Sequence, residues 1–546
     1  MKTVMTAMLV VTLLIVVSCA TLENSSKETG QPSKPPDVSL HEAALQGNVD
    51  AVRQHIKAGS DLNEKDIYGS TPLIVAATFG KTEVARAVID AGADINIPNN
   101  DGSTPLHIAA FLCRTEIVKA LLDKGADKHL RNNAGSTAYD SVAAPFDDVK
   151  GFYDSIGKAL GPLGLELDYE QIRMTRPKIA EMLRPRTEDL EAVRYTPLPE
   201  NDWEVSTPVE QGLDPMLVAE LYLDAAELET LYGLLVIKNG HLIAEGYFNE
   251  GGVEQLSGRQ SATKSYVSAL VGIALDQGYL SSVDQRMMEF FPEFAGQIDD
   301  PRKEQVTIRD LLQMRAGYPD EQRTPPYFDI FFLSGNWHWV THLVDFPLVS
   351  DPGTKFNYSN LTSHLLGVIV ARACDTDLKS YAQEHLFTPI HAEVGGWTAD
   401  ADNYNLGCTE IYVTARDMAQ FGLLYLNHGE YEGNRVLSAA WVRESLQTYS
   451  EGMYDNEWRG EASNYPGPYF RDIGYGYQWW SARAGDHRFN FAWGHGGNLI
   501  ILLDELDMIV VTTANPLHEL PGEAGWKHEG AIINLVGKFI KSLPRG

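Results

Sequence analysis

The residues best suited to chemistry are a serine and a lysine three positions apart, Ser261 and Lys264. Apolar residues follow Ser261 with helical spacing, so both side chains are expected on one face of a buried helix. At the start of that helix, the positive end of the helix dipole acts on the serine, and a partly desolvated lysine has a lowered pKa. Such a lysine can activate a hydroxyl, so the pair indicates a serine nucleophile.

Ser-x-x-Lys is a weak signal by itself, because the pattern also occurs at Ser155. Two later segments support Ser261. The first places Tyr358 and Asn360 after a Pro-Gly turn and before an apolar stretch that predicts a helix. The second, Trp-Gly-His-Gly-Gly-Asn, ends at Asn498 and precedes two apolar stretches that predict a pair of strands. The ordered set indicates a catalytic domain more strongly than any of its parts.

Together the three motifs resemble those of the class C β-lactamase-like serine hydrolases, which include penicillin-binding proteins, esterases, DD-peptidases and aminohexanoate-oligomer hydrolases. Segments 306–317 and 414–422 are also similar to that family. The resemblance spans roughly residues 205 to 540. It implies an α+β domain, with an antiparallel sheet flanked by helices, an additional helical region, and the catalytic serine between them.

The resemblance implies a role for each matched residue. Ser261 would attack the substrate carbonyl to give an acyl-enzyme, and Tyr358 and Lys264 would share the proton transfers, with Tyr358 favoured as general base. Asn360 would orient the substrate and the lysine. The backbone N–H groups of Ser261 and Asn498 would form the oxyanion hole, and no metal or other cofactor is expected. The alternatives are that Ser261 only caps a helix and that Tyr358 only packs in a core.

Penicillin-recognising members of that family usually carry Lys-Thr-Gly where this chain has His495, Gly496 and Gly497. A neutral imidazole is a poorer anion anchor than an ammonium, and no hydroxyl follows it. We therefore expect a small-molecule or peptide-like ester or amide substrate. The glycines indicate tight strand geometry near the substrate, and a proton-transfer role for His495 stays open. The alternative is a β-lactamase or DD-peptidase.

Residues 38–145 contain an internal repeat with a period of 33 residues. The period is marked by Gly69, Gly102 and Gly135. With the Thr-Pro-Leu and Gly-Ala-Asp segments, it resembles about three ankyrin repeats and a decaying fourth from Ser136. The resemblance implies an all-α array that binds a protein on its concave face; the alternative is that the array only caps or spaces the hydrolase domain. For the whole chain, a further alternative is an ankyrin-based binding protein with an inactive hydrolase scaffold. His41 and His107 are expected to hydrogen-bond between neighbouring repeats.

The N-terminal residues predict export and a lipid anchor. A short apolar stretch follows Lys2 and ends in Val-Val-Ser-Cys19, which resembles a bacterial lipoprotein signal with Cys19 as the lipidated residue. Residues 1–18 would be the signal peptide and 19–37 a flexible tether. The protein would be anchored to a membrane of the cell envelope, facing the periplasm or the exterior. A plain secretory signal or a short anchor is the alternative.

The composition of the chain as a whole is typical of a globular multidomain protein. Its 546 residues exceed one compact domain, and a net charge of −30 disfavours nucleic-acid binding. The sequence shows neither a cysteine framework nor metal-ligand spacing. Residues 146–204 are assigned to a linker between the ankyrin array and a hydrolase domain at 205–546.

Overall fold

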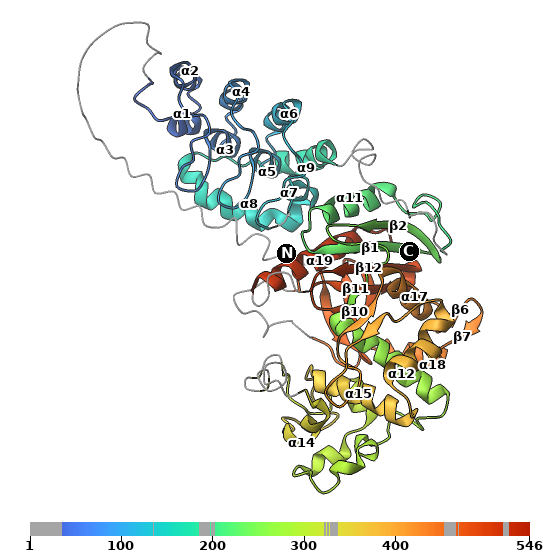
Figure 1. Ribbon diagram of the computed structural model, residues 1–546. Helices are drawn as coiled ribbons and strands as arrows, with labels where there is room; N and C mark the ends of the chain where they lie inside the picture. Colours follow the sequence, from blue (N-terminus) through green and yellow to red (C-terminus); the bar gives the residue numbers. More distant parts are fainter. Residues whose placement is uncertain are drawn as a thin grey trace. The chain divides into compact units, whose positions relative to one another are not determined.

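The computed structural model describes most of the chain after residue 34 (Figure 1). The described residues are 35–134, 136–184, 197, 203–321, 324, 327, 337–452, 466–467, 469–516 and 523–545. The predicted signal peptide, Cys19 and most of the predicted tether therefore lie outside them. Within this described part, every helix is too short or too polar to cross a bilayer. The chain divides into two compact units, Met1–Pro185 and Arg186–Gly546, and each is described by itself.

The first unit is a stack of helical hairpins. Its repeat helices are α1 (Leu40–Gln46), α2 (Val49–Ala58), α3 (Pro72–Thr78), α4 (Thr82–Asp90), α5 (Pro105–Phe111), α6 (Thr115–Asp123) and the short α7 (Asp140–Ala143). Figure 1 shows α1, α3 and α5 in one row and α2, α4 and α6 in another. Pro72 and Pro105 open their helices, where the missing N–H has no partner to lose. The predicted all-α repeat array is confirmed.

Contacts between neighbouring repeats hold the array together. His41 Nε2 lies 3.0 Å from the carbonyl oxygen of Ser70, and His107 Nε2 lies 2.9 Å from that of Ser136. The expectation that these histidines link neighbouring repeats is confirmed. At Gly69, φ is +71° and a Cβ would lie 2.8 Å from a backbone nitrogen of the next hairpin, which explains the glycine.

The structure differs from the sequence assignment of residues 146–204 to a linker. Two long helices, α8 (Phe146–Leu160) and α9 (Tyr169–Leu183), join through a 3₁₀ turn, η1 (Gly161–Leu163). Tyr153 stacks on Phe111 of α5 with ring centroids 4.8 Å apart, and its hydroxyl donates to the Phe111 carbonyl. Arg176 of α9 in turn donates to the Tyr153 hydroxyl at 2.6 Å. Residues 146–183 therefore extend the ankyrin core, which the sequence assignment missed.

The second unit is built on a seven-stranded antiparallel sheet of order β2-β1-β12-β11-β10-β9-β8. The strands are β1 (Leu231–Lys238), β2 (His241–Tyr247), β8 (Arg471–Tyr475), β9 (Trp480–Ala484), β10 (His487–Gly494), β11 (Asn498–Leu503) and β12 (Met508–Ala514). Asn239 and Gly240, a dipeptide typical of tight hairpins, form the turn between β1 and β2, and both residues have positive φ. The predicted strand pair after Asn498 is β11 and β12.

Each face of the sheet is covered by helices, because the buried strands are apolar on both sides. On β1, Leu235 and Ile237 belong to one core, and Leu234 and Val236 belong to the other. Helix α17 (Ala415–Leu426) covers the first face, beside α12 (Thr263–Asp276). The other face is covered by α11 (Pro215–Ala226) and α19 (Glu523–Ser542). The predicted antiparallel sheet with flanking helices is confirmed.

The predicted helical region lies between β2 and β8 in the sequence. Its remaining α-helices are α13 (Ile308–Leu312), α14 (His342–Asp345), α15 (Asn360–Ala373), α16 (Leu378–Ala382) and α18 (Ala439–Ser445). Its short helices are η2 (Gln260–Ala262), η3 (Met287–Phe290), η4 (Pro292–Phe294), η5 (Pro301–Gln305), η7 (Trp339–Thr341), η8 (Gln383–Phe387) and η9 (Thr388–Ile390), with η10 (Asp504–Leu506) before β12. The short strands are β3 (Ser257–Gly258), β4 (Gly396–Trp397), β5 (Ile411–Val413), β6 (Glu430–Tyr431) and β7 (Asn434–Arg435).

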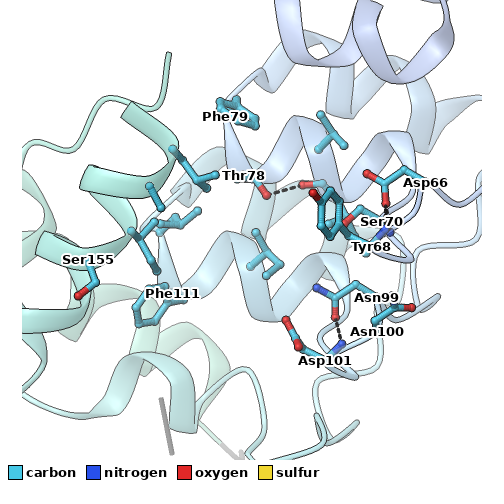
Figure 2. Close-up of a pocket in the computed structure, with 17 residues that line it drawn as sticks. Asp66, Tyr68, Ser70, Thr78, Phe79, Asn99, Asn100, Asp101, Phe111 and Ser155 are labelled. Carbon is cyan, nitrogen blue, oxygen red and sulfur yellow. Dashed lines mark hydrogen bonds between the residues drawn. The ribbon is translucent and has the colours of Figure 1, made fainter. Parts of the chain in front are cut away.

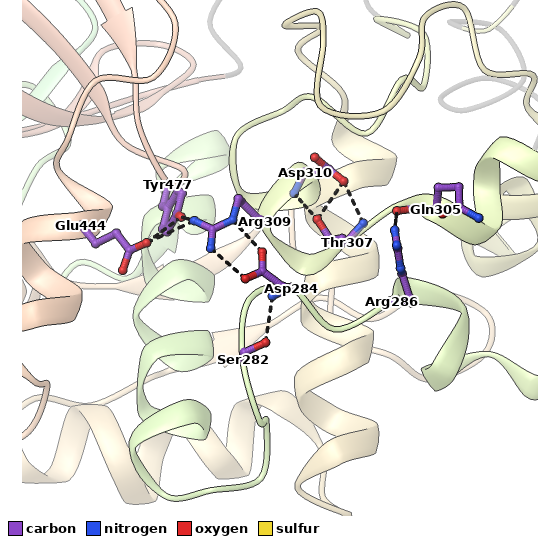
Figure 3. Close-up of polar contacts among 9 residues, drawn as sticks. All are labelled: Ser282, Asp284, Arg286, Gln305, Thr307, Arg309, Asp310, Glu444 and Tyr477. Atoms are coloured by element: carbon purple, nitrogen blue, oxygen red, sulfur yellow. Dashed lines mark hydrogen bonds and ion pairs between the residues drawn. The ribbon is translucent and has the colours of Figure 1, made fainter.

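A charged network fixes α13 to α18, to the loop before η3 and to the turn before β9 (Figure 3). Arg309 of α13 donates to Asp284 at 2.8 Å and to the Tyr477 hydroxyl at 2.7 Å. The Tyr477 hydroxyl donates to Glu444 of α18 at 2.9 Å. One guanidinium therefore holds three segments that are distant in sequence, and α13 packs directly against α15 behind the candidate site.

Candidate active site

Ser261 lies on η2, immediately before α12. The preceding residue, Gln260, has φ of +47°, a left-handed conformation that costs energy for a non-glycine residue. Two hydrogen bonds hold it there: its side chain donates to Glu410 at 2.6 Å, and its carbonyl accepts from Thr263 Oγ1 at 2.6 Å. Gly494, at the end of β10, lies so close that a Cβ would be 2.1 Å from the Arg259 carbonyl. The end of β10 is thereby brought beside Ser261.

Lys264 is 1% exposed and makes three hydrogen bonds from its Nζ atom. It donates to Ser261 Oγ at 3.0 Å, to Asn360 Oδ1 at 2.8 Å and to the Cys408 carbonyl at 2.8 Å. Burial lowers the pKa of Lys264 to about 8, because the charged form loses its hydration. Every partner is neutral, and with a pKa of about 8 the uncharged amine is a minor but populated form of this lysine at pH 7. The structure thus brings together three of the predicted residues, Ser261, Lys264 and Asn360.

Tyr358 lies in the loop before α15, with its ring against the same lysine. Lys264 Nζ is 4.9 Å from the ring centroid, and the ring stacks on Trp480 of β9 at 5.6 Å. Burial raises the pKa of Tyr358, and a side-chain hydrogen bond to Ser261 offsets only part of that rise. The phenol is therefore protonated at neutral pH. The predicted Tyr358 thus lies beside both Ser261 and Lys264.

The N-terminus of α15 is held by a buried carboxylate, Glu321, that the sequence analysis did not single out. It accepts hydrogen bonds from Ser359 Oγ at 2.6 Å and from the backbone N–H groups of Asn360 and Leu361 at 2.9 and 3.1 Å. Burial raises the pKa of Glu321 to about 7. The carboxylate fixes the helix turn that carries Asn360, and its charge favours the helix N-terminus. Nothing local distinguishes this glutamate in the sequence.

The third motif forms the turn between β10 and β11. Gly496 and Gly497 have φ of +85° and +95°, and a Cβ on either would approach a neighbour within 2.8 Å. His495 Nδ1 lies 2.6 Å from the buried carboxylate of Glu529, which also accepts the Gly496 N–H at 3.0 Å and Trp493 Nε1 at 2.6 Å. Burial lowers the pKa of His495, but Glu529 raises it by more, so the net shift is upward. Glu529 is a second buried residue that the sequence analysis missed.

Asn498, at the start of β11, connects this turn to the serine. Its Oδ1 accepts from Arg259 at 3.2 Å and from the Ala514 N–H at 3.2 Å, and its Nδ2 donates to the His495 carbonyl at 3.0 Å. The side chain is therefore occupied by structural bonds. Strand β11, which begins at Asn498, packs beside η2, which carries Ser261.

Gln478 joins the elements behind the site. Its carbonyl accepts from Ser265 of α12 at 2.8 Å, and its Oε1 accepts from Ser363 of α15 at 2.7 Å. Its Nε2 donates to the carbonyls of Leu311 and Leu312 on α13, both at 3.0 Å. The 2%-exposed side chain of Gln478 therefore ties α13 to α15, the helix of Asn360, and its backbone carbonyl adds α12, the helix of Lys264.

Replacing Gln478 with alanine should lower the free energy of unfolding by about 1–3 kcal/mol, because buried partners lose their hydrogen bonds. Denaturant unfolding followed by circular dichroism measures this, and the exposed Gln447→Ala variant is the matched control. Equal stability of the two variants would show that the network contributes nothing.

Among the described residues, no group of three or more His, Cys, Asp or Glu side chains is arranged to hold a metal ion.

Comparison with known proteins gives matches for both units. Residues 232–533, more than half of the chain, match the Beta-lactamase family model, and residues 40–132 match Ankyrin repeats (3 copies). The 6-aminohexanoate-dimer hydrolase of Paenarthrobacter ureafaciens is 27% identical over 280 residues, covering 48% of this chain and 68% of that protein. Beta-lactamase-like protein 2 of Dictyostelium discoideum is 25% identical over 221 residues, covering 35% and 38%. A solved penicillin-binding protein homologue from Caulobacter crescentus aligns with 14% identity and a TM-score of 0.45, covering 62% of this chain and 100% of that one.

Proposed function

The chain belongs to the beta-lactamase family, and from this we propose that it is a serine hydrolase that cleaves an ester or amide through an acyl-enzyme on Ser261. One observation carries the proposal: the Nζ atom of Lys264 lies 3.0 Å from Ser261 Oγ and is held by two neutral oxygens, those of Asn360 and Cys408. A buried amine with a pKa of about 8 can accept the serine proton near neutral pH.

In the first half of the reaction, Ser261 Oγ attacks the carbonyl carbon as its proton passes to the neutral amine of Lys264. The oxygen that gains negative charge is stabilised by the backbone N–H groups of Ser261 and Asn498. Lys264 then returns the proton, through the Tyr358 hydroxyl, to the departing alcohol or amine as the tetrahedral species collapses. The raised pKa of Tyr358 favours this relay role over that of primary base, which the motif alone had favoured.

In the second half, water attacks the acyl group and gives its proton to the same base. Ser261 leaves with that proton, and the carboxylic acid product is released. The same residues, Lys264 and Tyr358, therefore transfer protons from the attacking group and to the leaving group in both halves of the reaction, as microscopic reversibility requires.

The environment of His495 supports a substrate other than a β-lactam. Even when His495 is protonated, the carboxylate of Glu529 2.6 Å away balances its charge, so the pair attracts a substrate carboxylate weakly. Gly496 offers no hydroxyl to assist it. A relative is named for hydrolysis of 6-aminohexanoate dimer, which agrees with cleavage outside a lactam ring.

Covalent labelling and a substrate panel test the proposal. A fluorophosphonate probe should label the protein, and p-nitrophenyl butyrate or a p-nitroanilide should be hydrolysed faster than nitrocefin. If nitrocefin were the fastest substrate, the β-lactamase alternative would be correct. Release of D-alanine from a D-alanyl-D-alanine peptide would instead establish the DD-peptidase alternative. If the protein took no label and hydrolysed none of these substrates, the remaining interpretation would be an ankyrin-based binding protein with an inactive hydrolase scaffold.

Glu529→Gln should lower the pKa of His495, because the neutral amide removes the charge that favours imidazolium. The midpoint of the His495 imidazole titration, followed by NMR and assigned with a His495→Gln sample, should move to lower pH. Glu505→Gln is the matched control, since Glu505 lies 2.5 Å from a different histidine, His487. An unchanged His495 midpoint in Glu529→Gln would contradict the pairing.

We also propose that Cys19 is lipidated and holds the protein at a membrane of the bacterial cell envelope. The support is the apolar stretch that ends in Val-Val-Ser-Cys. In a bacterial host, the wild type should incorporate labelled palmitate and sediment with membranes, whereas Cys19→Ser should do neither. If the wild type and Cys19→Ser sedimented equally with membranes and neither incorporated palmitate, an uncleaved apolar anchor would be favoured.

A further inference from the structure

The ankyrin unit contains a cavity of about 300 Å³ that the proposed hydrolase chemistry does not use. Its walls come from α3, α5, the hairpin segments that precede these helices, and the C-terminal half of α8. Figure 2 shows Asp66, Asn99 and Asp101 of the hairpin segments on one side and Ser155 of α8 on the other. All of these elements belong to the same compact unit.

Most of the wall is apolar. Helix α5 contributes Ile108, the residues directly after α3 and α5 contribute Phe79 and Leu112, and α8 contributes Ile156 and Leu160. Such walls offer water few hydrogen-bond partners, although a space of this size would hold about ten molecules at the volume of liquid water. An engineered apolar cavity of about 150 Å³ binds benzene, and natural ligand pockets begin near 300 Å³. The cavity therefore suits one small organic molecule.

The polar side of the cavity is acidic. Asp66 uses its carboxylate to accept the backbone N–H groups of Tyr68 and Ser70, both at 2.8 Å. Asp101 differs, because the described part of the chain supplies no hydrogen-bond donor to its carboxylate; Asn99 contacts only its backbone N–H, at 3.0 Å. Lysine, arginine and histidine are absent from the described residues that line the cavity.

An ionised carboxylate beside apolar walls is only partly hydrated. Burial raises the pKa of Asp101, which reflects that lost hydration. A cation placed against the carboxylate would restore the lost interaction, whereas an anion would be repelled. The wall thus offers an attachment point for a positive group next to space for an apolar one.

We propose that this cavity binds a small amphipathic amine, with its ammonium group on the Asp101 carboxylate and its apolar body between α3, α5 and α8. The ankyrin unit then has a small-molecule site, separate from Ser261 and from any protein bound by the repeats. Three probes of equal length distinguish the contributions of charge and of apolar burial: 4-phenylbutylamine, 4-phenylbutanol and 4-phenylbutyrate.

Isothermal titration of the full chain at neutral pH should show tightest binding for the amine, weaker binding for the alcohol and none for the carboxylate. Asp101→Asn should weaken amine binding by about tenfold, the effect of losing one charge-assisted contact, and leave alcohol binding unchanged. Asp123→Asn, an exposed aspartate outside the cavity wall, is the charge-matched control. Equal binding of amine and carboxylate, or no binding of any probe, would overturn the proposal.

A second pair of variants keeps the test independent of Asp101. Ala159 lines the cavity from α8 and is exposed, so Ala159→Trp should fill the space without disturbing the core and abolish binding of the amine. Lys158→Trp, on the neighbouring exposed position outside the wall, should bind normally. Ser261→Ala should also bind the amine normally. Loss of amine binding in Ser261→Ala, or retention in Ala159→Trp, would place the amine elsewhere.

Discussion

Replacement of Ser261 by alanine is expected to reduce kcat/KM for the best ester or amide substrate by about 10⁴–10⁶-fold, as removal of a nucleophile does in other serine hydrolases. The physical reason is that alanine has no oxygen to form the acyl bond. Lys264, Asn360 and Cys408 retain their mutual hydrogen bonds in this variant, so the fold should persist. Initial-rate kinetics and fluorophosphonate labelling measure the effect, and the label should disappear completely.

Ser155→Ala is the matched control for this experiment, because Ser155 begins the other Ser-x-x-Lys segment of the chain. Ser155 Oγ only donates to the Gly151 carbonyl of its own helix, at 2.9 Å. Labelling and rates of Ser155→Ala should equal those of the wild type. If Ser261→Ala still formed a covalent adduct, another nucleophile would be acting and the assignment of Ser261 would be wrong.

Replacement of Lys264 by methionine should lower kcat/KM by about 10²–10⁴-fold, the usual contribution of a positioned general base. Methionine has a similar length but accepts no proton. The wild-type rate should also depend on pH in a defined direction. Only the neutral amine is a base, so kcat/KM should rise with pH and level off above the Lys264 pKa of about 8. Rates measured between pH 6 and 10 check both statements.

The control for Lys264→Met is Lys158→Met, the lysine at the corresponding position of the Ser155 segment. Thermal unfolding of both variants separates loss of the base from loss of the fold, since Asn360 and Cys408 each lose a donor in Lys264→Met. A folded Lys264→Met with the wild-type rate, or a wild-type pH profile without a limb near 8, would exclude the lysine as base.

Much of the fold was predictable from local sequence. The Asn239-Gly240 turn, the strand pair after Asn498 and the ankyrin period all depend on neighbouring residues, and all three are found in the structure. The pairing of β1 with β12 was not predictable, because 274 positions separate Val236 from its partner Val510, and no local pattern sets such a register. The packing of α8 and α9 was missed for a similar reason: their contacts are with each other and with the repeat helices α5, α6 and α7.

The site shows the same division. Spacing alone grouped Ser261 with Lys264, because one helical turn separates them. Motif order added Tyr358, Asn360 and Asn498, and the structure brings them to one place. The supporting residues Glu321, Glu529 and Gln478 carry no signature, since any buried glutamate or glutamine looks the same in a sequence. Their roles come from partners that only folding supplies.

The sequence by itself determined which atoms could react, because nucleophile, amine and phenol are properties of residue types and their order along the chain. Only the tertiary structure decided their protonation states. Burial lowers the pKa of Lys264 and raises that of Tyr358, and the Glu529 carboxylate raises that of His495. Such shifts depend on desolvation and on charges brought within a few ångströms from distant parts of the chain, so they do not exist until the chain has folded.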